Sequence, residues 1–391
     1  MSDRPNLVRR IPFPDSASRA VVTPLQPSVV YASPDPDALD DQYEGRAAGY
    51  TYGREGHPNA DVLAAMIDRL EGGTGGIVTG SGMSAVTATM LGLLGQGDHI
   101  VGGNQLYGRS LRMLTQDLPR WGITASLADP TDLDEMRAAI RPETRLMLVE
   151  VVSNPTLRVA DMDGIEALAK EHGLLLVVDN TFTTPAAFPA YARGADVVIH
   201  SVTKLLAGHS DVTLGYVLAR DPAMRKAIYD VNVTLGLTPS PFDCWMAERG
   251  LYTFDMRFDR AQANAIALAD LLVSHPAVDA VLYPGRQDHP DHARASALLG
   301  DQFGNMVSFR LKGERAKAVA LTRAAPQIAF APTLGDVGTT LSHPASSSHR
   351  GLTPAAREAL GITEGFFRVS VGCEPLDLLL RDFSGALDAA V

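Results

Sequence analysis

The chain has 391 residues, of which 46% are hydrophobic and 20% are charged, as is typical of a globular protein large enough for two domains. Its formal net charge of −11 at pH 7 argues against a nucleic-acid or anionic-membrane partner, because either would require a basic face. The two cysteines, Cys244 and Cys373, lack metal-type spacing and indicate a reducing compartment. There is no signal-peptide core and no apolar run near the ~18 residues of a membrane span, so we expect a cytoplasmic protein without a metal site.

The first stretch, residues 1–45, is predicted to be an extended arm, because its prolines remove backbone donors and disfavour helix. These prolines are Pro5, Pro12, Pro14, Pro24, Pro27, Pro34 and Pro36. The arm also carries apolar pairs, Val21-Val22 and Val29-Val30, which need a surface to cover. In a protein of this size that surface often belongs to another subunit.

Residues 46–255 are predicted to form an α/β domain with a mainly parallel sheet, because short β-branched runs alternate there with amphipathic helical segments. The predicted strands are 77–79, 98–101, 146–150, 174–178, 197–200 and 212–218. The predicted helices are 62–70, 82–94, 108–118, 162–172, 221–231 and 242–251. Asn59 is expected to cap the first helix, and Gly72-Gly73 to end it.

Residues 256–391 are predicted to form a smaller α+β domain. A long alanine-rich helix, 256–274, leads into it. Two segments, 305–311 and 366–371, alternate in hydrophobicity as half-exposed strands do. This alternation is typical of a small antiparallel sheet.

Two polar residues follow neighbouring strands of the predicted parallel sheet. Asp179 ends the run 174–178, and Lys204 comes shortly after the run 197–200. The carboxyl ends of parallel strands are where open α/β sheets place their chemistry. Taken alone, a lysine after a strand is more often a solvated surface group, and a Ser-x-Thr pair more often a cap or turn.

If Lys204 forms a Schiff base, its neighbours suit pyridoxal phosphate (PLP). A carboxylate such as Asp179 would keep the pyridine nitrogen protonated, which the ring needs to act as an electron sink. Tyr107 follows a predicted strand and could stack on the ring. Donors for the phosphate are available from two segments. They are Ser201, Thr203, Gly82 and Met83.

From about residue 20 to 385, the chain resembles the Cys/Met-metabolism family of PLP enzymes, the relatives of cystathionine γ-synthase, cystathionine γ-lyase, methionine γ-lyase and O-acylhomoserine sulfhydrylase. The matching stretches, in the family's order, are Tyr52-Gly53-Arg54, Ser81-Gly82-Met83, Tyr107-Gly108, Glu150 to Pro155, Asp179-Asn180-Thr181, Ser201 to Lys204, Gly208 to Asp211, Ser240 to Asp243, Leu334-Gly335, His343 to Ser346 and Arg368 to Gly372. The resemblance implies the aspartate-aminotransferase-like fold (fold type I) and PLP as the cofactor.

The resemblance also implies a role for each matching residue. Lys204 would be the Schiff-base lysine and the later proton shuttle, Asp179 would pair with the ring nitrogen, and Tyr107 would stack on the ring. Asn154 would contact the ring hydroxyl, and Arg368 would bind the substrate α-carboxylate through its planar fork. On local pattern alone, Asn154 could instead begin a turn, and Arg368 could be a surface charge on an edge strand.

The phosphate would be shared between subunits. The resemblance implies that the residues holding it in one subunit are Gly82, Met83, Ser201 and Thr203, and that Tyr52 and Arg54 reach it from the neighbour. The active site would then require a homodimer, which relatives usually pair into a tetramer. Without the resemblance, Tyr52 could simply pack within its own loop.

The sequence departs from common family patterns at positions that concern the substrate. Arg109 stands where methionine γ-lyases carry a cysteine, so that activity is disfavoured. Pro332 stands where many relatives have a glutamate that holds an amino-bearing substrate. Arg109, Thr333 and Asp336 are therefore candidates for contacting the substrate, although Arg109 and Asp336 could be merely solvated.

The resemblance implies β/γ-elimination, a C–S or C–O lyase reaction, on a γ-substituted amino acid of the cystathionine or homoserine type. The nearest alternative is γ-replacement, as in cystathionine γ-synthase or O-acylhomoserine sulfhydrylase. A remote alternative is a nucleotide-binding α/β protein that uses Gly80-Ser81-Gly82, but it lacks a full G-x-G-x-x-G and leaves Lys204 unexplained. His209 and His343 are expected to make structural hydrogen bonds.

Overall fold

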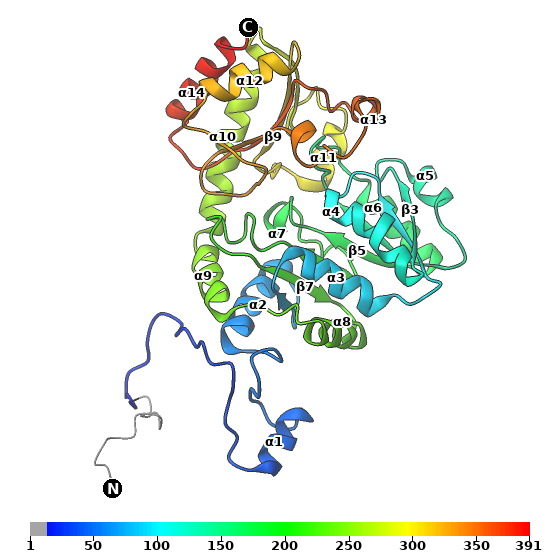
Figure 1. The fold of residues 1–391 in the computed structure, drawn as a ribbon, viewed down its shortest axis with the longest axis vertical. Helices are drawn as coiled ribbons and strands as arrows, with labels where there is room; N and C mark the ends of the chain where they lie inside the picture. The colour runs from blue at the N-terminus through cyan, green and yellow to red at the C-terminus, as the bar shows by residue number, and fades with distance from the viewer. Residues whose placement is uncertain (1–13) are drawn as a thin grey trace.

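The computed structural model describes residues 14–391, so the first 13 residues of the predicted arm lie outside the described residues. Figure 1 shows two sheet-containing bodies stacked along the long axis, with α10 (Phe254–Ser274) running from the lower body into the upper one. The arm leaves the lower body at the end opposite the C-terminus. No helix of residues 14–391 is both long and apolar enough to cross a membrane.

The lower body contains a seven-stranded sheet in the order β1-β7-β6-β5-β4-β2-β3. Its strands are β1 (Ile77–Thr79), β2 (His99–Gly103), β3 (Thr124–Ala128), β4 (Thr144–Glu150), β5 (Leu175–Asp179), β6 (Val197–His200) and β7 (Gly215–Ala219). Strands β3, β2, β4, β5 and β6 are parallel, and β7 is antiparallel to both of its neighbours, so the predicted mainly parallel sheet is confirmed. Strand β3 was not predicted, because its residues are mostly half-exposed or exposed at the sheet edge and carry no apolar run.

In the described part of the chain the helices of the lower body are α2 (Pro58–Glu71), α3 (Gly82–Leu93), α4 (Gly108–Arg112), α5 (Leu133–Ala138), α6 (Met162–His172), α7 (Thr184–Ala187), α8 (Pro222–Thr234) and α9 (Pro241–Leu251). The predicted single helix 108–118 is wrong in detail. After α4 the chain forms one π-helical turn, Met113–Asp117, and then a 3₁₀ turn, Leu118–Trp121, which has a proline in its first positions.

The start of α2 corrects a second prediction. The cap is His57, whose Nδ1 accepts the Ala60 N–H at 3.1 Å, because Pro58 already occupies the first helical position. Asn59 is buried instead and holds the arm, accepting from the Gln26 N–H and donating to the Pro24 carbonyl, each at 3.0 Å. Gly72 ends α2 in the left-handed conformation, as predicted.

The arm is extended for most of its described length but contains a helix that was not predicted. Helix α1 (Pro36–Tyr43) begins at the cap Asp35, whose carboxylate accepts the Ala38 N–H at 2.8 Å. A proline at the first helical position costs no hydrogen bond, which explains why the proline-rich composition did not prevent this helix.

The upper body contains a five-stranded sheet in the order β10-β11-β12-β9-β8, antiparallel except between β10 and β11. Its strands are β8 (Val278–Leu282), β9 (Met306–Leu311), β10 (Ala329–Phe330), β11 (Thr340–Ser342) and β12 (Phe366–Ser370). Besides α10, its helices are α11 (His292–Leu299), α12 (Arg315–Ala324), α13 (Pro354–Ala359) and α14 (Leu376–Asp388), with a 3₁₀ turn at Pro344–Ser346. The predicted long helix and antiparallel strands are thus present, and the boundary at 255/256 stays a prediction.

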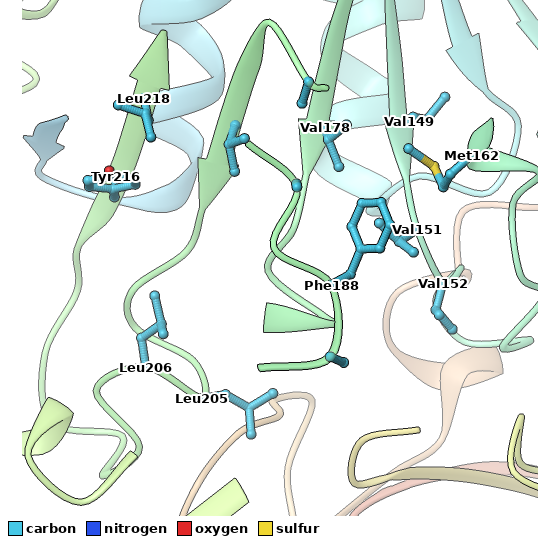
Figure 2. Packing of buried hydrophobic residues seen from close by; sticks show 14 of the residues in the cluster. Val149, Val151, Val152, Met162, Val178, Phe188, Leu205, Leu206, Tyr216 and Leu218 are labelled. Atoms are coloured by element: carbon cyan, nitrogen blue, oxygen red, sulfur yellow. The ribbon is translucent and has the colours of Figure 1, made fainter. Parts of the chain in front are cut away.

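Alternation along the strands divides the core of the lower body into two faces. Val149 and Val178 pack in one cluster, together with Phe188 and Met162 (Figure 2). Leu148 and Val177 pack in the other, with α3. Because successive side chains point to opposite faces, the strand-ending acids Glu150 and Asp179 lie on the α3 face.

Candidate active site

A cavity of about 270 Å³ lies at the carboxyl ends of β4, β5 and β6 and reaches residues of the upper sheet. Ten of the fourteen residues predicted for the site line it: Gly82, Met83, Tyr107, Asn154, Asp179, Ser201, Thr203, Lys204, Thr333 and Arg368. The other four, Tyr52, Arg54, Arg109 and Asp336, are not part of its lining. Within residues 14–391 no group of three or more His, Cys, Asp or Glu side chains is placed to hold a metal ion.

Lys204 follows β6 in a turn that other elements fix. Its Nζ donates to Thr333 Oγ1 at 3.3 Å, and burial, with the nearby Arg368 charge, lowers the pKa of its amine. Arg257 of α10 donates to the carbonyls of Leu205 and Leu206, at 2.8 and 3.0 Å, immediately after the lysine. This arginine therefore ties the start of the upper body to the turn that carries Lys204.

Asp179 ends β5 and is half-buried in the cavity wall. Burial raises the pKa of its carboxyl, opposed by hydrogen bonding to Thr181, whose N–H it accepts at 3.1 Å. Thr181 also fixes the next strand, since its hydroxyl accepts the Ser201 N–H at 2.8 Å. Thr181 belongs to the stretch Asp179-Asn180-Thr181 that matches the family, but no role was predicted for it. Its position two residues after the strand-ending acid was the signal in the sequence.

The N-terminus of α3 forms another wall. The first-turn N–H groups of Gly82 and Met83 have no helical acceptor, as at any helix start, and face a site suited to an anion. A Cβ at Gly82 would come within 2.6 Å of the Ser201 Cβ, so this approach requires glycine. Thr203 also lines the cavity, but its hydroxyl donates to the Leu214 carbonyl at 3.1 Å and would have to rotate to donate to an anion.

Arg368 enters the cavity from β12 and is almost fully buried. Its Nη1 donates to Asn154 Oδ1 at 2.7 Å and its Nη2 to the Thr333 carbonyl at 2.6 Å, while its buried Nε has no partner among the described residues. Burial lowers the pKa of the guanidinium to about 10, so it stays charged at neutral pH. A buried cation with an unused donor is suited to an anionic group of a ligand.

Tyr107 lies at the cavity mouth, 43% exposed, with its backbone N–H held by Glu150 Oε1 at 2.7 Å. Arg109 is exposed on α4 and is not part of the lining. Pro332 is in the lining, whereas Asp336 accepts the Gly338 N–H within its own turn. Other lining residues had no predicted role: Glu150, Thr181, Phe182, Thr213, Ser342, Ser347 and Ser348.

The remaining predicted positions lie elsewhere. Tyr52 and Arg54 stay together near the arm, with the Arg54 guanidinium 5.0 Å from the Tyr52 ring centre. His209 Nδ1 donates to the Ala207 carbonyl within its own turn. His343 bonds Ser346 Oγ through Nδ1 and donates from Nε2 to the Glu364 carbonyl, so both histidines have the structural hydrogen bonds that were predicted.

The donor set of the cavity fits PLP. An amine with a lowered pKa and a carboxylate lie in one cavity, at Lys204 and Asp179, and the close approach at Gly82 leaves a helix start beside a serine hydroxyl. These are the groups that an aldehyde, a protonated pyridine nitrogen and a phosphate respectively require.

Comparisons with known proteins agree with this fit. A family model described as "Cys/Met metabolism PLP-dependent enzyme" matches residues 6–388. A cystathionine beta-lyase of Bacillus subtilis is 40% identical over 338 residues, 86% of each chain, and a cystathionine gamma-lyase of the same organism is 36% identical over 96% of each chain. The crystal structure of cystathionine gamma synthase from Xanthomonas oryzae pv. oryzae matches with a TM-score of 0.90 and 37% identity, covering 96% of this chain and 95% of that chain. The predicted fold class is thereby confirmed.

Proposed function

Since the chain belongs to the Cys/Met metabolism family of PLP-dependent enzymes, we propose that it is a lyase that eliminates a sulfur- or oxygen-linked group from a γ-substituted amino acid of the cystathionine or homoserine type. The observation that carries the proposal is the pairing in one cavity of the Lys204 amine with the buried Arg368 guanidinium. The first suits proton transfer at Cα, and the second suits the α-carboxylate.

PLP, when bound, supplies an electron sink that stabilises negative charge on the substrate Cα. Asp179 would keep the pyridine nitrogen protonated, and Tyr107 would cover the ring. The phosphate would be held by four residues of the same cavity: Gly82, Met83, Ser201 and Thr203.

The substrate is oriented by Arg368, which binds its α-carboxylate, and Asn154 and Thr333 hold that arginine in place. Lys204 is neutral at a lower pH than an ordinary lysine, so its Nζ can remove the proton from Cα and return one further along the chain. Elimination with one water then releases the leaving group, ammonia and a 2-oxo acid.

A replacement reaction on an O-acylhomoserine is the second candidate, favoured by the high structural similarity to a solved cystathionine gamma synthase. The two are separated by incubating the PLP-loaded enzyme with cystathionine, methionine, homocysteine and O-acetyl- and O-succinylhomoserine, with and without cysteine or sulfide. We expect 2-oxo acid and ammonia without an added thiol. A replacement product formed without any 2-oxo acid, a thioether with cysteine or a thiol with sulfide, would overturn the lyase proposal.

We also propose a homodimer with shared sites, paired into a tetramer, in the cytoplasm. Support for the assembly comes from the arm, which exposes Val21, Val22, Val29 and Val30, and from Tyr52 and Arg54, which do not line the cavity of their own chain. The free cysteines suit a reducing compartment, which fractionation of the host cell would test.

Mixed oligomers test the shared site. Arg54→Ala and Lys204→Ala proteins should each be nearly inactive, because one lacks a phosphate ligand and the other lacks the amine. After unfolding and co-refolding, a randomly mixed dimer population should regain about a quarter of wild-type activity, since half of the dimers have one intact site of two. Activity no higher than the sum of the parents would exclude Arg54 from a neighbour's site.

A further inference from the structure

Glu150 is a buried acid in the cavity wall to which the reaction above gives no role. It ends β4, is 8% exposed, and lies in register with Asp179, which ends the adjacent parallel strand β5. Both side chains point to the α3 face of the sheet. The one hydrogen bond recorded for the Glu150 side chain within residues 14–391 is its acceptance of the Tyr107 N–H at 2.7 Å.

Two carboxyl groups at neighbouring strand ends, with little water, resist simultaneous ionisation. Burial and the negative charge of Asp179 raise the pKa of Glu150 well above its usual range. Burial also raises the pKa of Asp179, but Thr181 hydrogen bonds and the charge of His200 oppose that shift. Of the two carboxyls, Glu150 is therefore the one that holds a proton more readily.

The other ionisable groups in the cavity wall are Tyr107, Lys204 and Arg368. Among the described residues, no cation acts on the Glu150 carboxyl, and the acid paired with it in the sheet is Asp179. No neighbouring group therefore stabilises a second negative charge, on Glu150, beside that of Asp179.

We propose that Glu150 is a positioning residue that stays a neutral carboxylic acid, holds the main chain of Tyr107 over the cofactor ring, and leaves Asp179 as the single anion at the ring nitrogen. The proposal rests on the proposed function for the roles of Tyr107 and Asp179. An ionised Glu150 would compete with Asp179 for the ring proton, which the neutral acid does not do.

The protonation state is tested on the apoprotein, where PLP has no influence. Wild type and Glu150→Gln are unfolded thermally between pH 5 and 8. Folded Glu150 keeps a proton that the unfolded chain releases above its ordinary pKa of about 4.3, so wild-type stability falls as pH rises toward the folded pKa, whereas glutamine does not titrate. The midpoint difference, variant minus wild type, should therefore rise with pH. A midpoint difference that does not change with pH would overturn the proposal that Glu150 is a neutral acid.

The positioning role is tested by PLP affinity and by the absorption spectrum of the bound cofactor from pH 6 to 9. Glu150→Gln retains an acceptor for the Tyr107 N–H, so its PLP affinity and its absorption spectrum should both stay close to those of the wild type. Glu150→Leu removes it and should weaken PLP binding by about 5- to 30-fold, with a changed spectrum.

Three outcomes of this comparison have definite meanings. A Gln variant as impaired as the Leu variant would mean that the negative charge is required, which overturns the proposal. A Leu variant equal to wild type would mean that Glu150 positions nothing, which also overturns it. Failure of the wild type itself to bind PLP would instead contradict the proposed function, and the apoprotein titration would still report on Glu150.

Discussion

Replacement of Lys204 by alanine is expected to lower turnover by about 10³- to 10⁴-fold, because the cavity would lose its acid–base group. Lys204 is the only lysine in the lining, and burial together with Arg368 lowers the pKa of its amine. The loss should appear in kcat rather than in KM, since Arg368 and the phosphate-binding residues remain. The absorption band of the lysine-bound cofactor should disappear as well.

Two variants make this measurement specific. Lys204→Arg keeps a positive charge but stays protonated at neutral pH, so it should lose as much activity as alanine. Lys170→Ala removes an exposed lysine of α6 that pairs with Glu166, and should behave as wild type. Wild-type absorption retained in Lys204→Ala would place the cofactor linkage elsewhere.

The parts of the site that could be predicted from the sequence are those at the ends of buried strands. Asp179 and Lys204 each follow a run of β-branched residues, and such runs are easily recognised because burial on both faces excludes polar residues. That β5 and β6 are neighbours follows from the short right-handed connection between them. The sequence pattern alone therefore predicts that the Asp179 carboxylate and the Lys204 amine lie at the same edge of the sheet.

Contacts between distant segments could not be derived in this way. Arg368 donates to Asn154, which is 214 residues away in the chain, and to the carbonyl of Thr333, which lies in an irregular segment before β11. No local sequence pattern predicts either contact. The resemblance to known enzymes supplied the role of Arg368. The resemblance supplied no role for Glu150. The role proposed for this residue depends on the strands β4 and β5 ending in register.

A second class of error concerns local structure at positions where two signals compete. Pro36 counted against a helix, yet it is favourable at the first position of α1. Strand β3 was missed because an edge strand needs no apolar run. Exposed Arg109 was assigned to substrate binding on sequence position alone, and within one chain it does not line the cavity.

Replacement of Arg368 by lysine is expected to lower kcat/KM by about 30-fold or more, which corresponds to the ~2 kcal/mol lower limit for breaking a buried charged contact. Lysine keeps the positive charge, but a single ammonium cannot bind Asn154 Oδ1, the Thr333 carbonyl and a substrate carboxylate in one plane. Most of the loss should appear as a raised KM. PLP absorption should change little, because lysine keeps the positive charge that lies near Lys204.

The role of Arg368 in binding the α-carboxylate is tested most directly when the substrate is varied together with residue 368. Against an analogue that lacks the α-carboxylate, Arg368→Lys should cost much less, because the wild-type arginine then has no carboxylate to bind and its advantage over lysine disappears. Arg310→Lys, on the neighbouring strand β9, changes an arginine paired with Asp279 and should leave kinetics with both substrates unaltered. An equal loss for the two substrates would mean that Arg368 supports the cavity wall through Asn154 and Thr333 and does not bind the carboxylate.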